Sequence, residues 1–179
     1  MPSTSLIDVW DTIALEAERE SPLWAAALRP ATEREGDPVF SSLGEDRYAL
    51  GLETIYEGYL LHYGRPRLFS PADPNTALLL GDYLYAHGLV RIAALGKVSA
   101  VLDLAELISL CAQLRAVDAP GDGAAWAATA AAICSEQLDP ARHALRSSGD
   151  VTPLRALACE IAGAEAVARA LVAHDSRVR

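Results

Sequence analysis

Residues 75–96, NTALLLGDYLYAHGLVRIAALG, are apolar on nearly every side of the helix that they predict. This composition is typical of a central helix covered by its neighbours. Gly81 and Asp82 stand near the middle of the stretch. Gly81 permits another helix to approach closely, and a buried Asp82 requires a partner, because an unpaired carboxylate in the interior costs several kcal/mol. The partner is either a group of the same chain, such as His87, Arg91 or the backbone, or a group across a subunit interface.

The helical period continues on both sides of this stretch, and no convincing strand pattern accompanies it. The helix expected at 47–63 carries one large residue per turn on one face: Tyr48, Leu52, Ile55, Tyr59 and Tyr63. A single long helix is expected from Thr152, and an alanine-rich one from about Gly123 to Gln137. We therefore predict one all-α domain over residues 1–179, a helical bundle of seven or eight helices. It comprises N-terminal helices and a loop (1–46), a middle part (47–116) and C-terminal helices (119–179).

Composition and charge exclude several classes of protein. The 179 residues carry a net charge of -9, with 15 basic against 24 acidic residues, which argues against a nucleic-acid partner. No apolar stretch reaches the length of a transmembrane helix, and the acidic start does not resemble a signal peptide, so we expect a cytoplasmic protein. The three cysteines, at 111, 134 and 159, are expected to be buried free thiols.

Two motifs of the middle part lie at a fixed distance from each other. LHYGRPRLF at 61–69 contains Gly64, Arg65 and Pro66, and ALLLGDYLYAHGLVRIAALGKVSAVLDLAELI follows at 77–108 with Gly81 seventeen residues after Gly64. In motif, order and spacing, this region resembles the Gly-Asp helix pair of the trans-polyprenyl diphosphate synthases and the loop before it. The resemblance covers about residues 50–115 and implies an isoprenoid-synthase-like fold for the helices of 47–116.

The same resemblance implies candidate metal ligands. The family's first aspartate-rich motif, DDxxD, begins eleven residues before the glycine that corresponds to Gly64, which places ETIYE (53–57) at that motif. Glu53 and Glu57 then hold its outer positions, and Thr54 replaces the middle aspartate. Carboxylates at i and i+4 lie on one helical face and can share a Mg²⁺ ion. The simpler interpretation, which we favour, is that both glutamates form the solvent-exposed face of an amphipathic helix.

Arg65 and Arg67 are candidate substrate-binding residues in the proline-rich loop after the 47–63 helix. They could bind a diphosphate in a bidentate manner, or cap the last carbonyls of that helix. His62 and Tyr63 stand where the family has the arginines that grip the diphosphate. The second aspartate-rich motif is absent after residue 115. We therefore assign no catalytic residue and expect no cofactor for the chain alone, with Mg²⁺ entering only through a catalytic partner.

In the family, the Gly-Asp helix and its predecessor commonly form the subunit interface. The resemblance therefore implies interface or structural roles for five residues of the second helix: Gly81, Asp82, Tyr83, Tyr85 and His87. It also predicts an exposed apolar patch around 47–63 and 76–95. The tyrosines are expected in core or interface packing, with the lining of an isoprenoid tunnel as the alternative.

Three functions follow from these observations. The first is a non-catalytic, regulatory or structural, subunit of a heteromeric polyprenyl diphosphate synthase in isoprenoid biosynthesis, resembling the small component of heptaprenyl-type synthases and supporting a catalytic partner that carries DDxxD motifs. The alternative is a self-associating, homo-oligomeric helical protein that lost the prenyltransferase chemistry and binds an isoprenoid or another apolar ligand. The least favoured is a stand-alone Mg²⁺-dependent enzyme acting on a prenyl diphosphate, which requires Glu53, Glu57, Arg65 and Arg67 to converge on one pocket.

Overall fold

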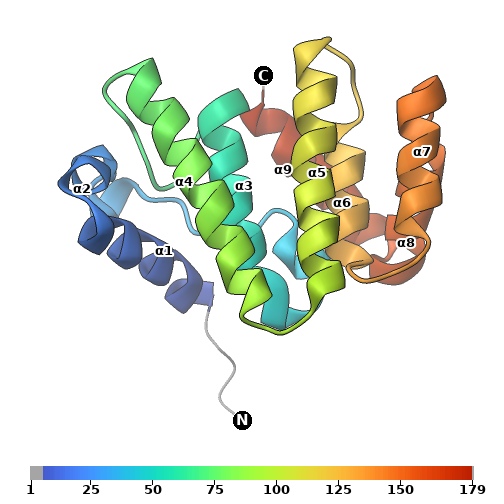
Figure 1. Cartoon of the computed structure of the whole chain (residues 1–179), viewed down its shortest axis with the longest axis horizontal. Coiled ribbons are helices and arrows are strands. Elements are labelled where there is room, and N and C mark those ends of the chain that lie inside the picture. Colours follow the sequence, from blue (N-terminus) through green and yellow to red (C-terminus); the bar gives the residue numbers. More distant parts are fainter. Residues whose placement is uncertain (1–5, 179) are drawn as a thin grey trace.

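The computed structural model describes residues 6–178, with side chains from residue 9 onward. These residues form nine α-helices (Figure 1): α1 (Leu6–Glu20), α2 (Pro22–Ala27), α3 (Ala49–Tyr63), α4 (Pro74–Ala93), α5 (Val98–Ala116), α6 (Asp122–Ala131), α7 (Leu138–Ser148), α8 (Thr152–Ala162) and α9 (Ala164–Arg177). Three 3₁₀ turns precede α3, at Ala31–Glu33, Ser41–Leu43 and Asp46–Tyr48. Within the described part, the only β pairing is an isolated bridge between Leu28 and Phe69. The all-α prediction is confirmed.

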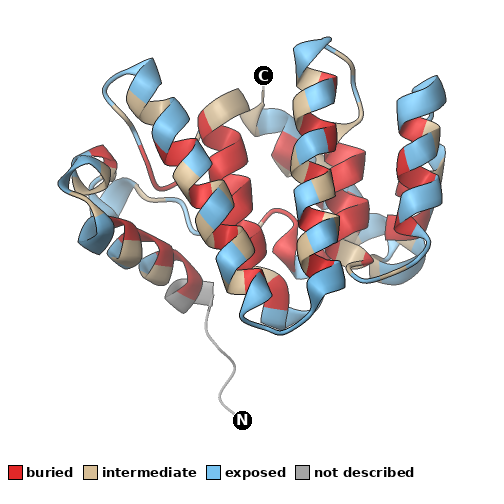
Figure 2. Ribbon diagram, viewed as in Figure 1, coloured by how far each residue is buried: buried red, intermediate tan, exposed pale blue. Residues whose placement is uncertain are grey.

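Helices α3 and α6 occupy the centre of the bundle. α3 packs against α4 and α1, whereas α6 packs against α5, α8 and α9. In Figure 1, α1 and α2 lie at one end of the molecule and α7 and α8 at the other, and Figure 2 shows the buried residues concentrated on α3 and α6. The core on the α6 side is built on aromatic contacts, among them Phe40 stacked on Trp126 with ring centres 5.7 Å apart.

The prediction that residues 75–96 form the central helix is wrong, because α3 is more deeply buried than α4. Residues 51–61 of α3 are all buried, whereas α4 leaves one side open, with Leu78, Leu79 and Val90 each more than half exposed. The apolar pattern of α4 therefore does not report burial on all sides. In the part of the chain that the structure describes, no helix is both long and apolar enough to cross a bilayer.

Glycines bring α3 and α4 into close contact. A Cβ atom on Gly58 would lie 2.9 Å from the carbonyl oxygen of Gly81, and one on Gly88 would lie 3.1 Å from that of Gly51. The two glycines of each helix are seven residues apart and thus face the same way. Because backbone meets backbone at both points, α4 lies against α3 closely enough to bury it.

The C-terminal region differs from the prediction in two places. The single helix expected from Thr152 is divided into α8 and α9, since Gly163 adopts φ 86° and ψ 140°, outside the helical region. This break accounts for nine helices rather than seven or eight. The alanine-rich helix α6 ends at Ala131 rather than Gln137, and Cys134 beyond it takes a left-handed conformation with φ 69°.

Candidate functional site: two closed polar centres and an open apolar face

Glu53, Glu57 and Arg67 form a fully buried cluster. The Arg67 side chain donates from Nη1 to Glu53 Oε2 at 2.8 Å and from Nε to Glu57 Oε2 at 3.0 Å. The exposed fraction of each side chain is 1 % or less. The i, i+4 spacing places both carboxylates on one side of α3, as the sequence indicates. That side faces Arg67 and not water.

Further donors complete this cluster. Glu57 Oε1 accepts the backbone N–H groups of Arg67 and Leu68, both at 2.7 Å, and Glu53 Oε1 accepts the hydroxyl of Ser41. The guanidinium also lies 4.3 Å from the ring centre of Trp10 on α1. Burial alone would lower the pKa of Arg67, but the two carboxylates raise it overall, so the guanidinium stays charged.

The prediction that Glu53 and Glu57 form a solvent-exposed face is wrong, because both are buried. Their geometry does not fit a magnesium site either. Mg²⁺ takes oxygen ligands in near-octahedral geometry and usually keeps several waters. Three of the four carboxylate oxygens here face Arg67 or its backbone, and the fourth accepts from Ser41. No group of three or more His, Cys, Asp or Glu side chains within residues 9–178 is arranged to hold a metal ion. The positive charge that these carboxylates need is supplied by the chain itself.

Arg65 lies apart from Arg67 and serves a different helix. Its Nη2 donates to the carbonyl of Ser176 at 2.8 Å, and its backbone N–H donates to that of Arg177 at 3.0 Å. Arg65 thus caps the C-terminal turn of α9, and not that of α3 as expected for the alternative to diphosphate binding. The four residues required for a stand-alone enzyme therefore do not converge on one pocket.

A second polar centre, which the sequence analysis missed, joins α3, α5, α6 and α9. Tyr59 donates its hydroxyl to Asp122 Oδ2 and accepts two bonds from Arg115, at 3.0 and 2.8 Å. His174 Nε2 lies 3.5 Å from the same carboxylate oxygen, and His174 Nδ1 lies 2.9 Å from the Tyr56 hydroxyl. These five residues come from distant parts of the chain without a common spacing, so no local motif signals them.

The environment of this centre fixes its charges. Burial alone would raise the pKa of Asp122, but the adjacent His174 imidazole, the hydrogen bond from Tyr59 and the Arg115 charge lower it well below its ordinary value. Burial and the Asp122 charge raise the pKa of Tyr59, so the phenol stays neutral. Because Tyr56, Tyr59 and His174 are buried, this arrangement can hold α9 against α3 and α6 but presents no open surface to a substrate.

Asp82 lies on the surface, contrary to the expected buried position. Its side chain is 66 % exposed, and its Oδ1 lies 3.3 Å from Nε2 of His62 on α3. Burial lowers the pKa of His62, and the Asp82 charge opposes this shift without cancelling it. His87 and Arg91, the partners considered for Asp82, both bind Glu16 on α1 instead.

The other four residues with predicted interface roles lie in the packing of the chain itself. Gly81 faces His62, whose ring stacks on Tyr85 with centres 5.1 Å apart. Tyr83 packs against Trp24 at 5.7 Å and His87 at 5.4 Å, towards α1 and α2. Of the predicted interface set, only Asp82 points away from the bundle.

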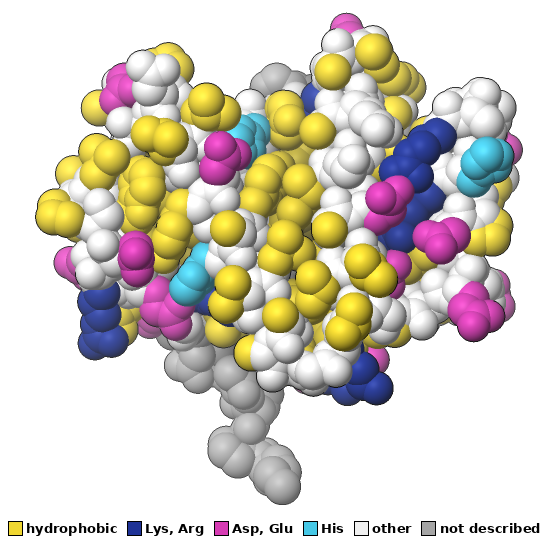
Figure 3. Space-filling view, in the orientation of Figure 1, with side chains coloured by type: hydrophobic (Ala, Val, Ile, Leu, Met, Phe, Trp, Pro, Cys, Tyr) yellow, Lys and Arg dark blue, Asp and Glu magenta, His cyan; other side chains and the backbone are white. Residues whose placement is uncertain are grey.

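An apolar surface lies instead across α4 and the start of α5. We call it the α4–α5 face; its large apolar members are Leu78, Leu79, Val90, Leu95, Val98 and Leu102, exposed by 42 to 73 %. Figure 3 shows hydrophobic side chains gathered over these two helices, with few charged groups among them. The predicted apolar patch is thus present on α4, but it continues onto α5 and not onto α3, which is buried.

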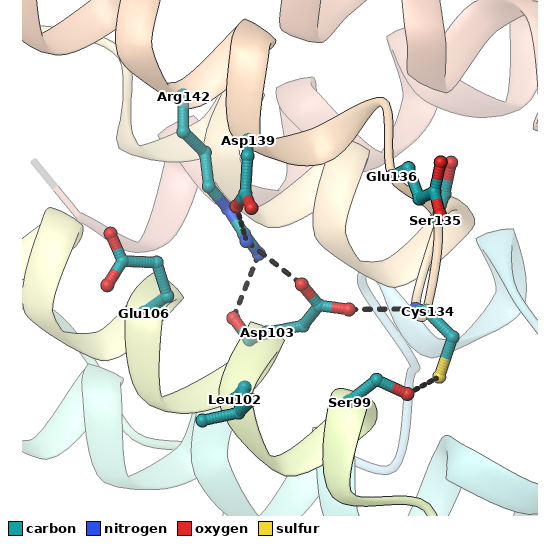
Figure 4. Close-up of a pocket in the computed structure, with 9 residues that line it drawn as sticks. All are labelled: Ser99, Leu102, Asp103, Glu106, Cys134, Ser135, Glu136, Asp139 and Arg142. Atoms are coloured by element: carbon teal, nitrogen blue, oxygen red, sulfur yellow. Dashed lines mark hydrogen bonds and ion pairs between the residues drawn. The ribbon is translucent and has the colours of Figure 1, made fainter.

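A polar hollow of about 480 Å³ lies between α5 and α7. Figure 4 shows the Arg142 guanidinium directed at Asp103, whose carboxylate also accepts the backbone N–H of Cys134 at 2.8 Å. Ser99 donates its hydroxyl to the Cys134 thiol at 3.2 Å. Of the three thiols expected to be buried, only Cys111 is; Cys134 is exposed and Cys159 is intermediate. Four groups of this hollow, Ser99, Asp103, Cys134 and Arg142, bind one another and join α5, α7 and the segment after α6.

Comparison of the chain with protein-family models, with curated proteins and with solved structures returned no match.

Proposed function

We propose that this chain is a non-catalytic, cytoplasmic subunit of a heteromeric polyprenyl diphosphate synthase, with an isoprenoid-synthase-like fold. The observation that supports the proposal is the Glu53–Glu57–Arg67 cluster. At the positions where the resemblance implies Mg²⁺ ligands, the chain keeps two carboxylates but neutralises them with its own buried guanidinium. Such an arrangement retains the helix and replaces the metal-dependent chemistry with a structural contact.

Two further features favour an associating subunit. The helices that carry the Gly64 and Gly81 motifs, α3 and α4, are joined by close backbone contacts at Gly58 and Gly81. The α4–α5 face leaves a contiguous apolar surface open, and surfaces of this kind mark sites of association. Under this proposal Mg²⁺ and the allylic diphosphate bind to the catalytic partner.

The test is reconstitution with a catalytic chain that carries both aspartate-rich motifs and is encoded in the same genome. The lone chain is expected to show no Mg²⁺-dependent transfer from isopentenyl diphosphate to an allylic diphosphate. Addition to the catalytic chain is expected to raise turnover or lengthen the product, and the two chains should co-purify. Turnover by the lone chain that is lost in Glu53→Gln would overturn the proposal. Equal activity of the catalytic chain with and without this one would also overturn it.

The alternative, a homo-oligomeric protein that lost the chemistry and binds an apolar ligand, shares the same neutralised cluster. It differs in the partner, which is a second copy of the chain. Co-purification and reconstituted turnover distinguish the two functions, because a purely self-associating protein would change neither in the presence of a catalytic chain.

A further inference from the structure

An open groove, which we call the α5–α7 groove, runs between these two helices. The polar hollow of about 480 Å³ lies beside their first turns, at Ser99 and Asp139. A second hollow of about 440 Å³ lies beside their last turns, at Leu114 and Leu145. The two helices therefore run in the same direction along the groove. From Ser99 to Leu114 its length is roughly 22 Å, at the rise per residue of an α-helix.

Side chains connect the two walls of the groove. Arg142 on α7 donates to Asp103 on α5 at 3.0 Å, as Figure 4 shows, and one turn later Arg146 binds Glu106 and Gln113. Arg142 is buried, whereas the side chain of Arg146 is 33 % exposed. Arg142 and Asp103 thus form the floor of the polar hollow and leave its rim open.

The rim of the polar hollow carries negative charge that the chain does not fully neutralise. The Asp139 side chain is 88 % exposed, and it lies 3.5 Å from Arg142, further away than Asp103. Glu136 is exposed, and its carboxylate forms no hydrogen bond or ion pair within residues 9–178. This end of the groove therefore attracts cationic groups.

The opposite end of the groove is apolar. Leu110, Leu114 and Leu145 form the floor of the second hollow and are buried, and Val117 stands at its rim, 74 % exposed. A hollow of this kind can bury an apolar side chain that enters from outside. Asp103 and Leu110 mark the two ends on α5 and are seven residues apart, which is roughly 10 Å along the helix.

We propose that the α5–α7 groove binds an amphipathic helix of a partner protein, with an apolar side chain between Leu114 and Leu145 and a lysine or arginine beside Glu136 and Asp139. Both walls are helices whose backbone groups bond internally, so an extended segment would find no backbone partners there, whereas a helix satisfies its own. Positions i and i+7 of a helix share one face and lie about 10 Å apart, which matches the separation of the two ends of the groove.

Charge assigns this groove to another protein and not to a second copy of the chain. Two copies with a net charge of -9 repel each other, and the incompletely neutralised charges at the rim are acidic as well. A basic segment is attracted by both. The inference does not rest on the proposed function: reconstituted prenyl transfer can fail while the groove binds its helix, and the reverse.

A display library of peptides about 16 residues long is a suitable probe, since a helix of that length spans the groove. Selection on the purified chain is expected to enrich peptides that carry a lysine or arginine seven positions from a large apolar residue. Val117→Asp and Glu136→Lys, both at exposed positions, should each raise the Kd of these peptides roughly tenfold. Circular dichroism checks that the helices persist in both variants.

Matched controls make the same changes outside the groove. Val172→Asp on α9 and Glu160→Lys on α8 alter exposed positions and shift the net charge equally. Both should leave the Kd unchanged, because the peptide touches neither residue. A loss of affinity in Glu160→Lys equal to that in Glu136→Lys would reduce the effect to overall charge and overturn the proposed site.

Cys134 reports the place of binding in the wild-type chain. It is exposed and lines the polar hollow, whereas Cys159 on α8 lies outside both hollows and Cys111 is buried. A saturating peptide is expected to slow the alkylation of Cys134 by iodoacetamide several-fold and to leave that of Cys159 unchanged. Mass spectrometry of the digested chain measures both rates in one sample.

The remaining outcomes would overturn the inference. They are a library without enrichment, enriched peptides that are acidic, a Kd that survives Val117→Asp or Glu136→Lys, and a bound peptide that leaves Cys134 as reactive as before. Alkylation of Cys134 that slows as the concentration of the chain alone rises would assign the groove to a second copy.

Discussion

Arg67 and Glu57 are joined twice, through Nε to Oε2 at 3.0 Å and through the backbone N–H to Oε1 at 2.7 Å, with both side chains fully buried. The loop after α3 is therefore fixed to the middle of α3 and not only to its end. The same guanidinium also binds Glu53, one turn earlier. Removing one member of this cluster leaves the others charged in an apolar surrounding.

Arg67→Met is expected to lower the free energy of unfolding by about 3–5 kcal/mol, because it leaves two buried carboxylates without their cation. Denaturant unfolding followed by circular dichroism measures the loss. Arg65→Met is the matched control and should cost much less, because Arg65 is exposed and binds only the end of α9.

A second experiment tests whether the unpaired charge of Glu53 and Glu57 causes the loss of stability in Arg67→Met. In a chain that already carries Glu53→Gln and Glu57→Gln, adding Arg67→Met should cost less than it does in the wild type, since no carboxylate is left unpaired. Additive losses in this double-mutant cycle would contradict the charge mechanism and assign the effect to packing alone.

Magnesium is expected to have no specific effect on the stability of the lone chain. A Mg²⁺ ion at Glu53 and Glu57 would have to displace the buried Arg67, and it would find no third carboxylate within the described residues. The midpoint of thermal unfolding should therefore be the same in MgCl₂ and in NaCl of equal ionic strength. A saturable rise with Mg²⁺ that disappears in Glu53→Gln would show that the cluster opens to metal.

Asp122 is expected to contribute to stability in a pH-dependent way. Its pKa in the folded chain lies below the ordinary value of 3.8, so its contribution is complete above that value and is lost as the pH falls through the folded pKa. The stability difference between wild type and Asp122→Asn should thus be largest near neutral pH and shrink in acid. Unfolding curves from pH 7 to pH 2 measure it. Asp139→Asn, at an 88 % exposed position, should stay close to wild type throughout.

Gly58→Ala is expected to destabilise the bundle by about 1–3 kcal/mol, because the new methyl group meets the backbone oxygen of Gly81, which cannot move without shifting α4. Gly81→Ala should cost less, since its methyl group meets the ring of His62, a side chain that can rotate. His62→Ala should relieve the cost of Gly81→Ala but not that of Gly58→Ala. Equal relief at both positions would contradict the assignment of these contacts.

Local sequence patterns predicted where the helices lie better than they predicted which residues of those helices are buried. The start of α2 depends on a local signal, Ser21 followed by Pro22, in which the Leu23 N–H donates to the Ser21 hydroxyl, a contact between neighbours in the chain. Burial depends on partners that are distant in sequence. Glu53 and Glu57 have the spacing of a solvent-exposed stripe, and the charge that makes their burial favourable comes from Arg67 on the following loop.

The prediction that α4 is covered on all sides failed for a related reason. A sequence records that Leu78, Leu79 and Val90 are apolar, but not whether the same chain covers them, and in this structure it does not. The second polar centre escaped prediction because Tyr56 and His174 are 118 positions apart. The Gly163 break was concealed by an apolar seam that continues through it, and a glycine within a helical pattern was the signal that could have revealed it.

The contacts of α9 also determine when this fold can be completed during synthesis. Arg65 and Tyr56 bind groups at positions 176 and 174, more than a hundred residues later. Chains emerge from the ribosome N-terminal part first, so α3 pairs with α4 long before α9 exists. Until α9 is released, Tyr56 on α3 lacks its partner His174 and part of its cover. Part of the aromatic surface of α3 is therefore expected to stay open in the nascent chain until α9 is released, a surface of the kind that chaperones bind.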